Sequence, residues 1–245
     1  MGIVKKKTKG GANHTAIVKS WKPPIFKPDV FILETLNKAD EREKRFEGRA
    51  LAELLIMSGK NPKYHYFQDA EELPHLAGLF RQSKYRFLHF SSHGSFDKIF
   101  TTNGALTYVE FAKIFSKSLA LKRAFFSACE IGNDLFSEVL AGSNAGVQSI
   151  VAPVQKIRFD HAAVIWGALY VSLFTENDET MKHDQIKERL ASLRHLFPVD
   201  FHFSGYHPDK KGVANKWVHT VVSKQNALAN IPTLPVAVTP AIAVA

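Results

Sequence analysis

The sequence predicts an α/β domain in which a mostly parallel β-sheet carries helices on both faces, with an antiparallel edge strand near the carboxyl end. Short apolar runs alternate with amphipathic segments through the amino-terminal half, and short connections join them. Near the other end, Val199, Phe201 and Phe203 alternate with polar residues, which is typical of a strand with one exposed face. Together these observations favour β-α-β units that are followed by an edge strand.

The amino-terminal half contains three expected strands and two expected helices. The first strand is the apolar run 29–34, and the charged stretch 37–45 that follows it is typical of an exposed loop or a helix start. The first helix has apolar residues at i, i+3 and i+4, and Gly59 ends it. The remaining expected elements are the helices 48–57 and 73–80 and the strands 64–67 and 87–92.

The second half continues the alternation. We expect helices at 106–115 and from 135 onward, and strands at 124–128 and 147–154. The stretch 162–174 is apolar nearly all round and too short to span a membrane, which predicts a buried helix. Further predictions are an amphipathic helix that contains Ile186, Leu190, Leu193 and Phe197 and ends at Pro198, a turn at 207–212, and a helix or a strand at 213–222.

The chain divides into one large domain and two tails. Residues 28–224 have the length and the apolar content of a packed α/β domain. Residues 1–27 lack periodicity and contain four lysines close together, so we expect a flexible basic lead-in. Residues 225–245 carry no charged side chain and contain three prolines; we expect them to lie extended against the domain or a partner.

Composition limits the classes of function. A single cysteine excludes an internal disulfide framework, so a reducing cytoplasmic location is expected. No apolar run is long enough for a membrane span. The nucleotide-binding and zinc motifs GxGxxG, P-loop, CxxC and HExxH are absent from the sequence, so we expect no cofactor and no metal. The net charge of +9 keeps a nucleic-acid partner open, but no aromatic residues interleave with the amino-terminal lysines, and we do not expect one.

Two apolar runs end in residues that can carry chemistry. The run Phe87 to Ser92 leads to His93, and the run Ala124 to Ala128 leads to Cys129. Since ligands and catalytic groups collect at the carboxyl edge of parallel strands, we expect these two side chains to lie side by side. A lone cysteine with a histidine distant in sequence is the pattern of a nucleophile and its base, although such a cysteine is also commonly a small core residue.

The segments His89-Phe90-Ser91-Ser92-His93-Gly94 and Phe126-Ser127-Ala128-Cys129-Glu130-Ile131-Gly132 resemble the histidine and cysteine motifs of caspase-like cysteine peptidases, in particular the CHAT type. The stretch 145–154 resembles the next strand of that domain, although Pro153-Val154 stand where the family usually has a tryptophan. The clear resemblance covers about residues 85–175. It implies a caspase-like fold and a cysteine endopeptidase that uses a His93/Cys129 dyad, with an oxyanion hole formed by the N–H groups of Gly94 and Cys129.

The resemblance implies a protein substrate, a regulatory or defence role and, in some relatives, a protein activator. Caspases place glutamine where this chain has Ser127, which argues against a strict aspartate preference. Carboxylates near the expected strand ends could instead receive a basic side chain: Glu130, Asp97, Asp134 and Asp160. The alternative function is a non-catalytic caspase-like module that binds a partner through the same cleft.

Overall fold

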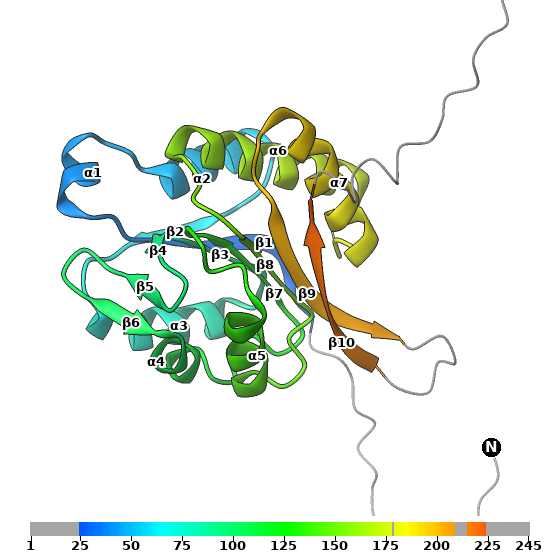
Figure 1. The fold of residues 1–245 in the computed structure, drawn as a ribbon, viewed down its shortest axis with the longest axis horizontal. Helices are drawn as coiled ribbons and strands as arrows, with labels where there is room; N and C mark the ends of the chain where they lie inside the picture. Colours follow the sequence, from blue (N-terminus) through cyan, green and yellow to red (C-terminus); the bar gives the residue numbers. More distant parts are fainter. Residues whose placement is uncertain (1–24, 178, 209–214, 224–245) are drawn as a thin grey trace, which may run out of the picture.

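A computed structural model of the chain describes residues 25–177, 179–208 and 215–223 (Figure 1). The predictions for the basic lead-in up to residue 24, for the tail 225–245 and for most of the turn at 207–212 therefore lie outside the described residues. Within the described ranges, no helix combines the length and the apolar character that a membrane crossing requires.

Seven strands form the main sheet in the order β10-β9-β8-β7-β3-β1-β2. Neighbouring strands are parallel from β2 to β8, whereas β9 is antiparallel to β8 and β10 is antiparallel to β9. This arrangement confirms the predicted architecture. The strands are β1 (Lys27–Glu34), β2 (Lys63–Tyr66), β3 (Tyr85–Ser91), β7 (Arg123–Ser127), β8 (Ser149–Pro153), β9 (Phe201–Pro208) and β10 (Asn215–Val222).

Helices cover both faces of this sheet, as predicted (Figure 1). One face carries α2 (Glu47–Met57), α6 (Phe159–Glu176) and α7 (His183–Leu196). The other carries α3 (Leu73–Ser83), α4 (Tyr108–Ile114) and α5 (Asp134–Ser143). Two short elements lie in connections, α1 (Lys38–Arg42) and the 3-10 turn η1 (Ala70–Glu72).

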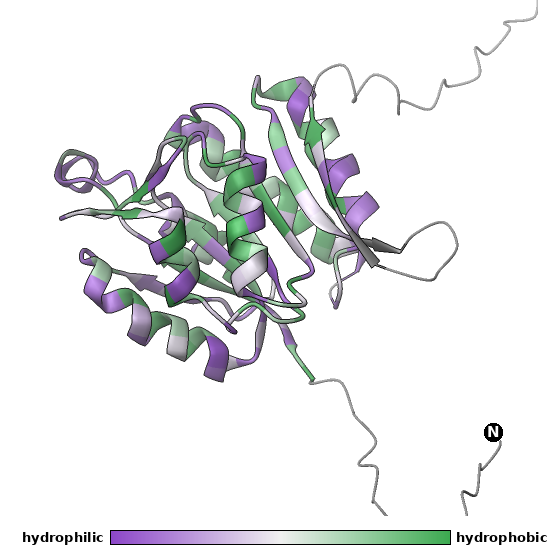
Figure 2. Ribbon diagram, turned by 60° about the horizontal axis from the view of Figure 1, so that its bottom comes forward, coloured by the Kyte–Doolittle hydropathy of each residue, from purple (hydrophilic) through white to green (hydrophobic). Residues whose placement is uncertain are grey.

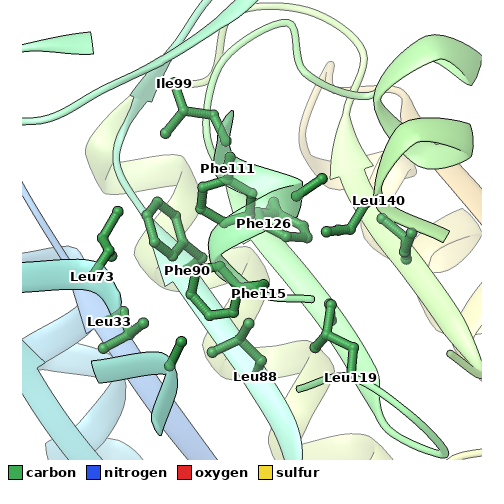
Figure 3. Close-up of a cluster of buried hydrophobic side chains, with 14 of the residues drawn as sticks. Leu33, Leu73, Leu88, Phe90, Ile99, Phe111, Phe115, Leu119, Phe126 and Leu140 are labelled. Atoms are coloured by element: carbon green, nitrogen blue, oxygen red, sulfur yellow. The ribbon is translucent and has the colours of Figure 1, made fainter. Parts of the chain in front are cut away.

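Because side chains alternate along a strand, the central strands supply two separate hydrophobic cores. Phe87 of β3 packs toward α2 and α6, whereas Phe90 packs toward α3, α4 and α5. Figure 3 shows the second core, in which Phe90, Phe111, Phe115 and Phe126 lie together; the ring centroids of Phe90 and Phe111 are 5.0 Å apart. The central strands are hydrophobic along most of their length, and the helices are mixed (Figure 2), which is the pattern of a sheet buried on both faces.

Three sequence predictions need correction. A small antiparallel sheet consists of β4 (His93–Gly94), β5 (Lys98–Phe100) and β6 (Ala105–Thr107), so the predicted helix at 106–115 begins only at Tyr108. The predicted edge strand β9 is an interior strand, because β10 covers it, and His202 is consequently buried. The charged stretch after β1 forms α1, in which Asp40 is buried although an exposed segment was expected.

Glu34 at the carboxyl end of β1 is a fully buried acid. Its carboxylate accepts hydrogen bonds from the Gly48 N–H at 2.7 Å and from the Tyr64 hydroxyl at 2.7 Å. Burial is the main cause that raises the pKa of Glu34 from the ordinary value of 4.5 to about 7, and the neighbouring Glu47 adds to the rise. Between these two pH values the folded protein keeps a proton that the unfolded chain has lost.

This difference in proton binding makes stability fall as the pH rises. We expect the free energy of unfolding to lose about 3 kcal/mol between about pH 4.5 and pH 7 through Glu34, and nothing further above that range. Glu34→Gln should flatten this part of the pH profile, as measured by denaturant unfolding at a series of pH values. Glu53→Gln, on the exposed side of α2, is the matched control, and an equal flattening there would contradict the assignment to Glu34.

Candidate active site

His93 and Cys129 follow adjacent parallel strands in the same register. Ser91 of β3 pairs with Ser127 of β7, and each candidate residue lies two positions beyond its strand's last residue. The N–H of Ser92 donates to the Ser127 carbonyl at 3.1 Å, which carries the pairing one residue past the strand end. The two segments therefore leave the carboxyl edge of the sheet side by side, as the sequence predicts.

Gly94 brings the backbones of the two segments into contact. A Cβ atom at position 94 would lie 2.6 Å from the Cys129 carbonyl oxygen and 2.7 Å from Cγ2 of Ile131. Real Cβ atoms do not approach other atoms that closely, so only glycine permits this packing. The glycine after His93 thus sets how near the histidine segment comes to the cysteine turn.

The imidazole of His93 is held by a carboxylate. Its Nε2 lies 2.6 Å from Oδ2 of Asp40, whose side chain is only 5% exposed. Because a carboxylate can only accept, this short contact places the ring proton on Nε2 and leaves Nδ1 able to take a proton. Asn37 Nδ2 also lies 3.0 Å from Nε2, but it is a donor, because Asn37 Oδ1 caps the backbone of α1, and it cannot bond to Nε2 while Nε2 carries the proton. The ring also packs edge-on against Phe159.

Cys129 is partly exposed and faces the loop between β8 and α6. Its Sγ accepts from the Ile157 N–H at 3.4 Å and faces the Ile157 carbonyl at 3.7 Å. Within the described residues no hydrogen bond joins His93 to the thiol. The His93 ring touches Phe159 at the start of α6 and the thiol touches Ile157 in the loop before it, so neighbouring residues of one segment border both side chains.

Within the described residues, one backbone N–H group on each of the two segments makes no hydrogen bond to another backbone group. The Cys129 N–H has no hydrogen-bond partner in the part of the chain that the structure describes. Gly94 pairs with Ile99, and the next pair outward is hydrogen-bonded through Ser95 N–H and the Lys98 carbonyl. Because hydrogen-bonded and non-bonded pairs alternate in an antiparallel ladder, the Gly94 N–H points away from β5.

The turn after the cysteine is backbone-strained. Glu130 has φ +62°, a left-handed conformation that costs an ordinary residue about 1–2 kcal/mol. This reversal brings the Glu130 N–H to the Gln155 carbonyl and the Gly132 N–H to the Pro153 carbonyl. The chain then enters α5, which Asn133 caps through the Phe136 N–H. The cysteine thus lies on a turn that is fastened to β8 on one side and to a helix on the other.

Two of the four predicted substrate carboxylates lie near this turn. Asp97, in the exposed β4–β5 turn, and Glu130 both act on Tyr108. Burial is the main cause that raises the pKa of Tyr108 to about 12, and the two carboxylates add to the rise. The Tyr108 hydroxyl donates to the Ser95 carbonyl at 2.9 Å. Asp97 and Glu130 therefore flank the segment that follows Gly94.

The other two predicted carboxylates are engaged elsewhere. Asp134 in the first turn of α5 accepts from His202 Nε2 at 2.7 Å. Asp160 in the first turn of α6 is exposed and forms a two-pronged ion pair with Arg158 at 3.0 and 2.7 Å. The hydrogen bonds from Arg158 hold the pKa of Asp160 well below its usual range. The structure therefore does not bring all four carboxylates to one place.

Asp40, which contacts His93, is not among the candidate residues predicted from the sequence. It follows β1, which neighbours β3 in the sheet, so the rule that placed His93 and Cys129 at the carboxyl edge applies to it as well. Its charged surroundings in the sequence instead indicated an exposed segment. The sequence feature that could have indicated Asp40 is its place shortly after a strand that was expected to lie in the parallel sheet.

Solved structures that are similar to this chain include the following two. A secreted C11 cysteine protease from Bacteroides thetaiotaomicron, iotapain, is 10% identical, with 75% of this chain and 67% of that one covered and a TM-score of 0.49. Caspase-1 from Spodoptera frugiperda is 14% identical, with 80% of this chain and 86% of that one covered and a TM-score of 0.48. No family model matches the sequence, and no curated protein matches it.

Proposed function

We propose that this chain is a caspase-like cysteine endopeptidase of the CHAT type, with His93 as the base and Cys129 as the nucleophile. The observation that carries the proposal is the contact between Gly94 and the Cys129 backbone, together with the Asp40 carboxylate on His93. A cysteine and a histidine at adjacent strand ends, with a third group orienting the base, form the arrangement that activates a nucleophile.

The reaction follows from these groups. Nδ1 of His93 takes the proton from the Cys129 thiol, and the sulfur attacks the carbonyl carbon of a peptide bond. In this reaction the N–H groups of Cys129 and Gly94 stabilise the resulting oxyanion, and one such donor is typically worth about 10²–10³ in rate. His93 then returns the proton to the departing amine, and water hydrolyses the acyl-enzyme. Asp40 keeps the ring in the tautomer that these steps need.

A basic residue before the cleaved bond is the proposed preference. Glu130 directly follows Cys129 in the chain, and Glu130 and Asp97 both lie near Tyr108, whereas Asp134 and Asp160 already have an imidazole and a guanidinium partner. A lysine or arginine side chain of the substrate could form an ion pair with the first two.

The proposal is tested on the thiol itself, because Cys129 is the only cysteine in the chain. Iodoacetamide should label the native protein near neutral pH faster than a free thiol of pKa about 8.5, and His93→Ala should slow that labelling. His75→Ala, at an exposed histidine of α3, is the control. The readout is the single mass shift of the intact protein over time.

New protein amino termini in cells, compared between the wild type and Cys129→Ala, give the second readout. Termini that depend on Cys129 and follow lysine or arginine would support both the reaction and its preference, whereas a dominant aspartate would contradict the preference alone. Slow labelling that is indifferent to His93→Ala, together with no Cys129-dependent termini, would contradict the peptidase and leave the non-catalytic binding module.

A further inference from the structure

A cluster of imidazoles and carboxylates lies where α5 meets the β9–β10 pair. Asp134, His202 and His219 each offer one ligand atom, and these atoms all lie within 4.8 Å of one another. Asp134 Oδ1 is 2.7 Å from His202 Nε2 and 3.4 Å from His219 Nδ1. Glu138, one turn further along α5, lies 3.6 Å from the other ring nitrogen of His219. None of these groups takes part in the reaction proposed for Cys129.

The ligand types of this cluster suit a metal ion. A ring nitrogen that carries no proton has a lone pair, and the Asp134 carboxylate has only acceptor oxygens, so all three groups can donate electron pairs to one cation. Two imidazoles and a carboxylate form a donor set that Zn²⁺ takes in proteins.

The surrounding hydroxyls hold both imidazoles. Ser204 Oγ lies 2.8 Å from His219 Nδ1, so an ion bound at that nitrogen would replace this hydrogen bond and leave the hydroxyl to His202. His202 Nδ1 lies 3.3 Å from Ser204 Oγ and 3.4 Å from Ser137 Oγ. A hydroxyl can donate or accept, so Nδ1 can lose or carry the ring proton without losing its partner. When Nδ1 carries it, Nε2 turns its lone pair toward Asp134 and His219. Metal-binding histidines are commonly held in this way by a second hydrogen bond.

We propose that Asp134, His202 and His219 bind a Zn²⁺ ion, through Oδ1, Nε2 and Nδ1 respectively, with Glu138 orienting His219 from its Nε2 side. The side chain of His202 is 3% exposed and that of Asp134 is 68% exposed. The ion would therefore be bound by one buried ligand, His202, and would keep a coordination position on the solvent side that water can occupy. The site differs from the sequence expectation of no metal because its ligands come from three elements far apart in the chain.

The position of the site gives the ion a structural effect. Asp134 is the first residue of α5, shortly after the turn that carries Cys129. His202 and His219 lie on the two antiparallel strands that close this side of the sheet. A bound ion would fasten the beginning of α5 to β9 and β10. This inference does not depend on the proposed peptidase activity.

Equilibrium dialysis of the full chain against ZnCl₂ tests the site, with Cys129→Ser as the background so that the thiol cannot bind the ion. We expect one Zn²⁺ per chain and a rise in melting temperature of about 5 °C at saturating metal. His219→Ala and Asp134→Asn should each weaken binding by at least about tenfold. His195→Ala, an exposed histidine at the end of α7, should bind as the background does.

Melting of each variant without metal shows whether it folds. If His219→Ala does not fold, Glu138→Gln serves in its place, because Glu138 is exposed and its loss should still weaken binding about tenfold. Failure of the folded background to bind Zn²⁺ at micromolar concentrations would overturn the proposal. Unchanged binding in both folded ligand variants would overturn it as well, because the ion would then lie elsewhere.

Discussion

Asp40→Asn is expected to slow alkylation of Cys129 and cleavage of its substrates by about 10²–10⁴-fold. Asp40 Oδ2 contacts His93 Nε2 at 2.6 Å and can only accept, so it favours the tautomer that leaves Nδ1 free for the proposed role as base. An amide at this position can donate to Nε2 instead, and the ring can then turn its proton toward the thiol. The measurement is the rate of the single mass shift with iodoacetamide, followed as a function of pH.

A purely structural role of Asp40 must be separated from this effect, because Asp40 also accepts from Arg45 Nη1 at 2.7 Å. Arg45→Ala removes that ion pair and leaves the contact with His93. Glu43→Gln, whose exposed carboxylate pairs with Arg45, is the control for charge on the same segment. We expect both variants to react within a few-fold of the wild type. An equal loss in Arg45→Ala would show that Asp40 acts by holding α1 in place.

Gly94→Ala is expected to damage the site and the fold together. The new Cβ would lie 2.6 Å from a backbone oxygen, which is a group that cannot move aside as a side chain can. Overpacking of this kind typically costs about 1–3 kcal/mol, which for a domain of this size lowers the melting temperature by about 2–12 °C. Relief of the clash must also push the histidine segment away from Cys129. Thermal unfolding and the alkylation rate of the thiol measure the two effects.

Gly78→Ala is the matched control for this substitution. Gly78 lies inside α3, and nothing lies within 4 Å of the position its Cβ would take. Alanine in a helix is favoured over glycine by about 0.5–1 kcal/mol, so this variant should melt at or above the wild-type temperature and keep full thiol reactivity. Unchanged stability and reactivity in Gly94→Ala would mean that the two segments are not held together by close packing at the glycine.

Local patterns predicted those parts of the fold that a single element determines. The apolar runs that became β3 and β7 are buried nearly throughout, so their composition indicates their surroundings. The helix α6 instead has one buried face and exposed residues such as Asp160 and Val164. That the segments of His93 and Cys129 lie side by side could be predicted because a parallel sheet brings the ends of neighbouring strands together. The strands β4, β5 and β6 are too short to show a periodic pattern of apolar residues. The start of α4 was in contrast predictable, because Thr107 and Glu110 have the spacing of a capping box.

What the sequence did not reveal depends on contacts between distant elements. His202 alternates with apolar residues as an exposed position would, and only the placement of β10 and α5 buries it. Asp40 is buried among charged neighbours because its partners, His93 and Arg45, come from other segments. In both cases a hydrogen-bond partner makes it possible to bury the polar side chain. That partner comes from a distant segment, so the local sequence pattern does not indicate it.

The order of the strands in the sheet has a consequence for how the chain is made. β1, β3, β7 and β8 all leave the ribosome before β9, yet β9 and β10 are the strands that cover the far side of β8. Until they arrive, the nascent chain presents a β8 edge that is buried along its whole length in the finished protein. An open apolar edge of that kind is a template for pairing with other chains. The sheet is therefore completed only when β9 and β10 have been synthesised. A chain released before that point exposes the unpaired edge of β8, which can pair with other chains.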